Sequence, residues 1–145
     1  MTRVGDLMTE EVLWFPPKMP LLRAAQALSQ RQVGAAPVCL PDGRVVGVLS
    51  KSDLLDRFGE DPEGRVVADA MTPVVLSMRP DSQIEEAIRE MVFEGVHHLM
   101  VLDEIGRLRG VLSATDILRH LSGFPRRDDR VIAVAPPEDH SHKPR

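Results

Sequence analysis

The chain has 145 residues and a formal net charge of −4, and 43% of its residues are apolar although few are aromatic. This length fits one domain or two small halves with a shared aliphatic core, and the acidic balance disfavours nucleic acid, which proteins bind through cationic patches. One cysteine excludes an intramolecular disulfide, acidic residues interrupt the N-terminus before any apolar run, and no stretch approaches the roughly 20 apolar residues of a membrane span. We therefore expect a cytoplasmic protein that neither binds nucleic acid nor spans a membrane.

The first part of the chain predicts five elements in the order β-α-β-β-α. They are an extended piece at 12–15, a helix over 21–28, strands at 37–40 and 45–49, and a second helix that begins near Ser52. The first helix is predicted because its leucines and alanines recur at helical spacing. Gly43 marks the tight turn between the two strands, where glycine tolerates a positive φ.

The second part predicts the same five elements in the same order. They are an extended piece at 74–78, a helix over 84–91, strands at 99–102 and 108–112, and a helix that begins near Thr115. Each unit is too small to bury much apolar surface alone. We therefore expect the two units to pack their sheets together in a mixed α/β fold.

The two parts are copies of one unit. A shift of 63 residues places 4–55 over 67–118 without a gap, and 18 of these 52 positions are identical. We therefore expect a first repeat at 4–58, a linker at 59–66, a second repeat at 67–121 and a flexible tail at 122–145. The linker follows from its Gly, Pro and acidic residues, and the tail from its prolines and charges.

Four motifs in each unit together resemble the CBS (cystathionine-beta-synthase) repeat. They are Met-Thr near the start, an apolar-Pro-Val or related strand, Asp-Gly or Gly-Arg at the turn, and Gly-Val-Leu-Ser-x-Ser/Thr-Asp before the last helix. The resemblance covers residues 4–121 and implies a Bateman module, an α/β (α+β) pair of β-α-β-β-α repeats with pseudo-two-fold symmetry. It also implies that a cleft between the repeats senses AMP, ADP, ATP, NAD or S-adenosylmethionine, and that the module is a homodimer which regulates a separate, unknown partner protein.

The resemblance implies two candidate sites for an adenosine-type ligand, each built from both repeats. In each, the Asp at the start of the last helix would accept hydrogen bonds from the ribose hydroxyls, and nearby Ser or Thr would reach the ribose or phosphate. The first set is Val12, Leu13, Gly34, Ala35, Ser113, Thr115 and Asp116. The second set is Val75, Leu76, His97, His98, Ser50, Ser52 and Asp53. From the residues alone, the Ser-x-x-Asp spacing is equally a helix-capping box that needs no ligand.

The repeats differ where a phosphate would lie. The resemblance implies that His97 faces phosphate, whereas Gly34 stands where a related repeat carries a phosphate-binding Arg. This difference weakens the case for a multiply phosphorylated ligand. A histidine that must be protonated would also make the response sensitive to pH.

Two other classes of function are weighed against the sensor. A ligand-free structural module could use the same fold to dimerise or dock. An enzyme is not expected, because the sequence shows no nucleophile–base–acid set, no metal-ligand spacing and no Gly-rich phosphate loop. We therefore expect no metal site and no required cofactor, with an adenine nucleotide as a regulatory ligand.

Overall fold

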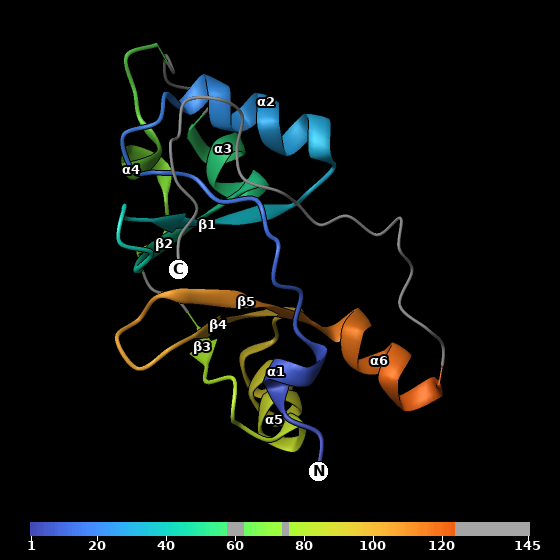
Figure 1. Cartoon of the computed structure of the whole chain (residues 1–145). Coiled ribbons are helices and arrows are strands. Elements are labelled where there is room, and N and C mark those ends of the chain that lie inside the picture. The colour runs from blue at the N-terminus through green and yellow to red at the C-terminus, as the bar shows by residue number, and fades with distance from the viewer. Residues whose placement is uncertain (58–62, 74–75, 124–145) are drawn as a thin grey trace.

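The computed structural model describes residues 1–57, 63–73 and 76–123 (Figure 1). The helices are α1 (Val4–Leu7), α2 (Leu21–Arg31), α3 (Lys51–Arg57), α4 (Val67–Ala70), α5 (Ile84–Glu94) and α6 (Ala114–Ser122). The strands are β1 (Ala35–Cys39), β2 (Val45–Ser50), β3 (Ser77–Met78), β4 (His98–Leu102) and β5 (Leu108–Ser113). Residues 59–62 of the predicted linker and 124–145 of the predicted tail lie outside the described residues.

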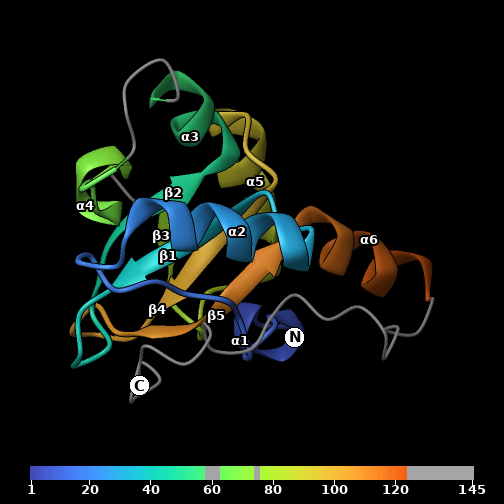
Figure 2. The same ribbon diagram turned by 90° about the horizontal axis from the view of Figure 1, so that it is seen from above.

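Two small sheets form the middle of the molecule. The first pairs β1 with β2 antiparallel, and in the second β4 lies between a parallel β3 and an antiparallel β5. The sheets are stacked, with α2 and α3 outside the first sheet and α1 and α5 outside the second (Figure 1). Seen from above, α2 lies over β1 (Figure 2).

The turns of the two hairpins meet in a reciprocal contact. The N–H of Val45 donates to the carbonyl of Gly106 at 3.0 Å, and the N–H of Leu108 donates to the carbonyl of Gly43 at 2.9 Å. Val45 and Leu108 occupy the same position in the two repeats, so the contact is made once in each direction. This relation is the pseudo-two-fold arrangement that we expected, and the predicted mixed α/β (α+β) fold is confirmed.

Within the described residues, the extended pieces before the long helices form only short stretches of paired strand. Residues 12–15 form a single parallel bridge, from Phe15 to Val38. Two prolines follow directly, and proline has no N–H with which to continue a ladder. The piece predicted at 74–78 is a strand only at Ser77–Met78, while 74 and 75 lie outside the described residues.

Each repeat packs its opening segment on the other half of the molecule. Val4 in α1 joins the core of the second half, and Val67 in α4 joins the core of the first half. Thr9 pairs with Val111 on β5 through two hydrogen bonds of 2.9 Å. Thr72 pairs in the same way with Val48 on β2, again at 2.9 Å in both directions. The exchange ties the halves together through the backbone, because the Met-Thr segment of each repeat pairs with the last strand of the other repeat.

The core between the sheets is mainly aliphatic, as the composition predicted, and it includes the aromatic Trp14 and Phe15. Leu13 and Phe15 of the first repeat are fully buried and belong to the same cluster as Met100 and Val111 of the second. Cys39 lies in this cluster, and burial raises the pKa of its thiol to about 12, so it is a core residue. Within the described residues, no helix is both long and apolar enough to cross a bilayer.

Candidate functional site

A cleft of about 440 Å³ opens between the two sheets. The residues that line it come from both repeats. They are Val12, Leu13, Val33, Gly34, Ala35, Pro37, Val48, Ser50, Asp53, Thr72, Leu76, His98, Met100 and Val111. This volume lies within the roughly 300–1,000 Å³ that small-molecule sites occupy.

The cleft brings together members of both predicted sets. From the first set it takes Val12, Leu13, Gly34 and Ala35, and from the second it takes Leu76, His98, Ser50 and Asp53. Backbone pairing explains this combination. Ala35 lies opposite Ser50 in the β1–β2 ladder, and the N–H of Lys51 donates to the carbonyl of Gly34 at 2.8 Å. The first repeat therefore places its own glycine and its own aspartate on one wall.

Asp53 presents a carboxylate to this cleft. Its Oδ2 atom accepts hydrogen bonds from the backbone N–H and the hydroxyl of Ser50, both at 2.9 Å. Its Oδ1 atom accepts from the Thr72 hydroxyl at 3.1 Å. The side chain is thus held in place at the start of α3, while Asp53 is only half-buried. A carboxylate offers about four acceptor positions, so capping does not exhaust it.

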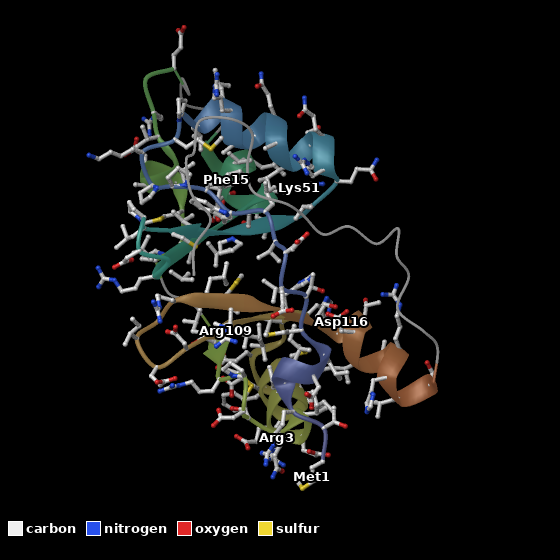
Figure 3. All side chains as sticks on the ribbon, in the orientation of Figure 1. Met1, Arg3, Phe15, Lys51, Arg109 and Asp116 are labelled. Atoms are coloured by element: carbon white, nitrogen blue, oxygen red, sulfur yellow. The ribbon has the colours of Figure 1, made fainter. Side chains whose placement is uncertain are left out.

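Asp116 is the counterpart of Asp53 in the second repeat, but its surroundings differ. Asp116 and Ser113 are each only 5% exposed. The Ser113 N–H donates to Asp116 Oδ2 at 3.0 Å, and the Asp116 N–H donates to Ser113 Oγ at 3.0 Å. These bonds form the capping box of α6, whose first turn carries Asp116 in Figure 3. Neither residue lines the cleft, so Asp116 acts in this structure as a buried helix cap.

The other predicted site residues lie away from the cleft. Ser52 and Thr115 are exposed in the first turns of α3 and α6. His97 lines a separate apolar hollow between α5 and α6. His98, its neighbour, faces the cleft instead, as alternation along an extended chain requires. Val75 lies outside the described residues.

The sequence interpretation missed six of the residues that line the cleft. They are Val33, Pro37, Val48, Thr72, Met100 and Val111. Thr72 is the polar member, and its hydroxyl binds the Asp53 carboxylate. The repeated Met-Thr pair draws attention to Thr72 in the sequence. Its position beside β2, however, depends on the exchange of opening segments between the repeats.

His98 is the ionisable base on the cleft wall. It lies on β4 opposite Ser113. Burial lowers its pKa below the ordinary 6.5, the neighbouring His97 lowers it further, and Asp116 opposes both. The imidazole is therefore mainly neutral at pH 7, and the cleft gains a positive charge only on acidification.

This lowered pKa predicts how stability depends on pH. The folded state binds the His98 proton less tightly than the unfolded chain does. The contribution of His98 to the free energy of unfolding is therefore complete above pH 6.5, and it is lost as the pH falls toward the pKa of the folded state. Urea unfolding between about pH 7.5 and about pH 5.5 should show a larger loss of stability for the wild type than for His98→Gln. Equal losses in the two proteins would contradict the assignment.

Comparison with known proteins identifies the repeated unit. The CBS domain model matches residues 4–60 and again residues 67–123. The structure of CBSX2 from Arabidopsis thaliana in complex with AMP is 29% identical, with a TM-score of 0.76 over 87% of this chain and 100% of that chain.

Two curated relatives are longer proteins. Protein MJ1232 of Methanocaldococcus jannaschii is 29% identical over 124 residues, which are 85% of this chain and 41% of the relative. The 5'-AMP-activated protein kinase subunit gamma-3 of Sus scrofa is 33% identical over 111 residues, which are 70% of this chain and 22% of the relative. The chain thus spans less than half of either relative. Because the two model matches coincide with the internal repeat and with the two halves of the fold, the chain belongs to the CBS domain family and carries two copies of the domain.

Proposed function

We propose that this chain is a regulatory module that binds an adenosine-type ligand in the cleft between its two sheets and signals to a separate partner protein. The Asp53 carboxylate carries the proposal, because it is fixed by Ser50 and Thr72 and lines the cleft. CBSX2, which shares the fold, was solved with AMP. CBS pairs are generally regulatory, and no catalytic step is proposed for this one.

The cleft offers the two kinds of contact that a nucleoside requires. Aliphatic side chains such as Val12, Leu13 and Val111 provide apolar walls for the flat adenine ring. The ribose carries two adjacent hydroxyls. The Asp53 carboxylate already accepts three hydrogen bonds from Ser50 and Thr72, so it has room for one of these hydroxyls and would accept the second where the Thr72 hydroxyl turns from Asp53 to the ribose. Asp53 and Thr72 would therefore hold the ribose, with the base between the sheets.

Regulation requires the ligand to favour one arrangement of the module over another. Among the described residues, backbone links between the repeats are made by the hairpin turns and by the exchanged opening segments, residues 2–9 and 65–72. A ligand held by Asp53 of the first repeat and by Leu76 and His98 of the second would bridge the halves between these links. A partner protein would then read their relative position. The partner and the cytoplasmic location remain predictions.

We also propose that two copies associate through the outer face of α5 and α6. Three large apolar side chains that line the hollow between these helices are exposed, and they are Val92, Leu118 and Leu121. Apolar patches of this kind mark interaction sites. A monomeric mass in light scattering would contradict the homodimer.

A ligand-free structural module is the second candidate function. It is favoured by one observation, since Asp53 already caps α3 through Ser50 and needs no ligand for that role. Asp116 does the same for α6. The two functions differ in whether a small-molecule ligand binds in the apolar cleft.

A thermal-shift panel separates the two functions. It would contain adenosine, AMP, ADP, ATP, NAD and S-adenosylmethionine, with cytidine and CMP as controls that share the sugar and phosphate but not the purine. A ligand at about 100 times its dissociation constant stabilises the folded state by about 2.7 kcal/mol. We expect such a shift with at least one adenosine compound and none with the cytidine pair. No shift with any adenosine compound would support the structural module.

A further inference from the structure

The hollow between α5 and α6 has a volume of about 390 Å³ and shares no lining residue with the cleft. Apart from His97 and Gly95, the residues that line it have apolar side chains. Three of these side chains are largely open to solvent, since Val92 is 76% exposed, Leu118 64% and Leu121 66%. Large apolar side chains that stay exposed together mark a surface to which another segment or molecule binds.

The duplication shows that the fold itself does not require all of this apolar surface. The first repeat forms the same helix pair, α2 and α3, from equivalent positions of the chain. It keeps a leucine at the position of Leu118, but the exposed Ser29 stands at the position of Val92. Its second helix begins with the exposed Lys51, whereas α6 begins with Ala114. The additional apolar residues of the second repeat therefore point to an occupant of the hollow.

The chain itself carries an apolar segment close to this hollow in the sequence. Helix α6 ends at Ser122, and Gly123 caps it in the left-handed conformation. Leu121, which lines the hollow, thus lies directly before the point where the chain leaves the helix. Further along the sequence, residues 131–135 are all apolar, and two prolines follow them. This apolar run is the occupant that the chain can supply without a second molecule.

The chain between the hollow and the apolar run is long enough to bring the two together. Nine residues separate Leu121 from Val131, and an extended chain spans about 3.3 Å per residue. The nine residues of α6 extend only about 13.5 Å, at about 1.5 Å per residue, so the run can reach either end of the hollow. A tether this short holds the run at an effective concentration of about a millimolar, which a second copy would have to match.

We propose that residues 131–135 bind in the hollow between α5 and α6 of the same chain and there exclude a second copy. The run has no charged side chain to remove from water, and the hollow presents apolar side chains from both helices, so the two surfaces are buried together. The exclusion of a second copy rests on the proposed homodimer, whereas the docking within one chain does not. Association of two copies through this face then requires the run to leave the hollow.

Paramagnetic broadening in NMR spectra of the full chain tests the docking. Glu138→Cys accepts a spin label just beyond the run, because the natural Cys39 is buried and the pKa of its thiol is raised to about 12, so that it does not react. We expect the label to broaden the amide signals of Gly95 and Leu118 in the labelled molecule itself. A second change, Ile132→Asp, places a charge in the run and should remove this broadening.

Sedimentation equilibrium of full-length variants tests the competition with a second copy. Ile132→Asp should form dimers with a dissociation constant at least about tenfold lower than that of the wild type, because the tethered run no longer fills the hollow. The matched control Ser141→Asp adds the same charge to the tail outside the run, and it should dimerise as the wild type does. Equal dissociation constants for the wild type and Ile132→Asp would overturn the competition.

The two experiments distinguish failure of the docking from failure of the homodimer. Unbroadened signals of Gly95 and Leu118, or equal broadening with and without Ile132→Asp, would overturn the docking. Broadening that arises only between a spin-labelled chain and a separate isotope-labelled chain would place the run in another copy and overturn docking within one chain. Broadening within one chain, with neither the wild type nor Ile132→Asp forming dimers, would support the docking and contradict the homodimer.

Discussion

Replacement of Asp53 by Asn should weaken the binding of adenosine by about 10- to 100-fold, because hydrogen bonds to a charged group contribute about 1.5–3 kcal/mol and about 1.4 kcal/mol corresponds to tenfold. Asn keeps the shape of the side chain and one acceptor oxygen, but it loses the negative charge that favours donation from the ribose hydroxyls. The Oδ1 atom of Asp53 accepts from the Thr72 hydroxyl at 3.1 Å, and both residues line the cleft. Calorimetry with adenosine measures the loss.

Asp116→Asn is the matched control for this experiment. It makes the same chemical change at the same position of the other repeat, but at a buried carboxylate that does not line the cleft. We expect a loss of stability of about 1–3 kcal/mol and an unchanged affinity for adenosine in the folded protein. Wild-type affinity in Asp53→Asn, or an equal loss of affinity in both variants, would show that the cleft is not the site.

Replacement of Gly110 by Ala should destabilise the fold by about 1–3 kcal/mol, the usual cost of forcing an extra methyl group into a close-packed site. A Cβ at this position would lie 2.6 Å from the backbone oxygen of Thr9 and 3.0 Å from Sδ of Met8. Two hydrogen bonds to Val111 fix the backbone of Thr9. This backbone can move away from the added methyl group only if its pairing with β5 breaks. The change therefore tests the exchange of opening segments, and urea unfolding measures it.

Gly34→Ala provides the control, because its added methyl group meets nothing within 4 Å. Alanine restricts the unfolded chain more than glycine does, so this variant should be unchanged or more stable by up to about 1 kcal/mol. If the two alanine variants unfold at the same urea concentration, the close approach of the Met8-Thr9 segment to β5 is wrong.

Periodicity in the sequence predicted most of the fold. The two long helices follow from apolar residues at helical spacing, and the two hairpins follow from apolar runs around Gly43 and Gly106. Because the unit is duplicated, each element is predicted twice, from two different stretches of the sequence. These signals are local, so they do not depend on knowing which segments meet in space.

The exchange of α1 and α4 could not be predicted in this way. A four-residue helix is too short to show a periodic pattern, and its partner strand lies far away in the chain. In the sequence, Val4 is the first residue of the first repeat, but in the structure it packs in the core of the second half. The structure alone reveals that Thr72 reaches Asp53.

The sequence named eight of the residues that line the cleft, but it divided them between two separate sites. Antiparallel pairing across the Gly43 turn places Ala35 opposite Ser50, so the glycine and the aspartate of the first repeat had to share a wall. That register was available from the sequence. The burial of Asp116 was not, because the same Ser-x-x-Asp motif lies in a cleft in one repeat and in a packed interior in the other.

A crystal structure of the protein grown with saturating adenosine would test the central claim most directly. We predict that the ligand lies between the two sheets, with its ribose hydroxyls at about 2.5–3.2 Å from the Asp53 carboxylate and its adenine against Val12 and Leu13. Adenosine bound elsewhere, or an empty cleft in a protein that binds adenosine in solution, would contradict the account.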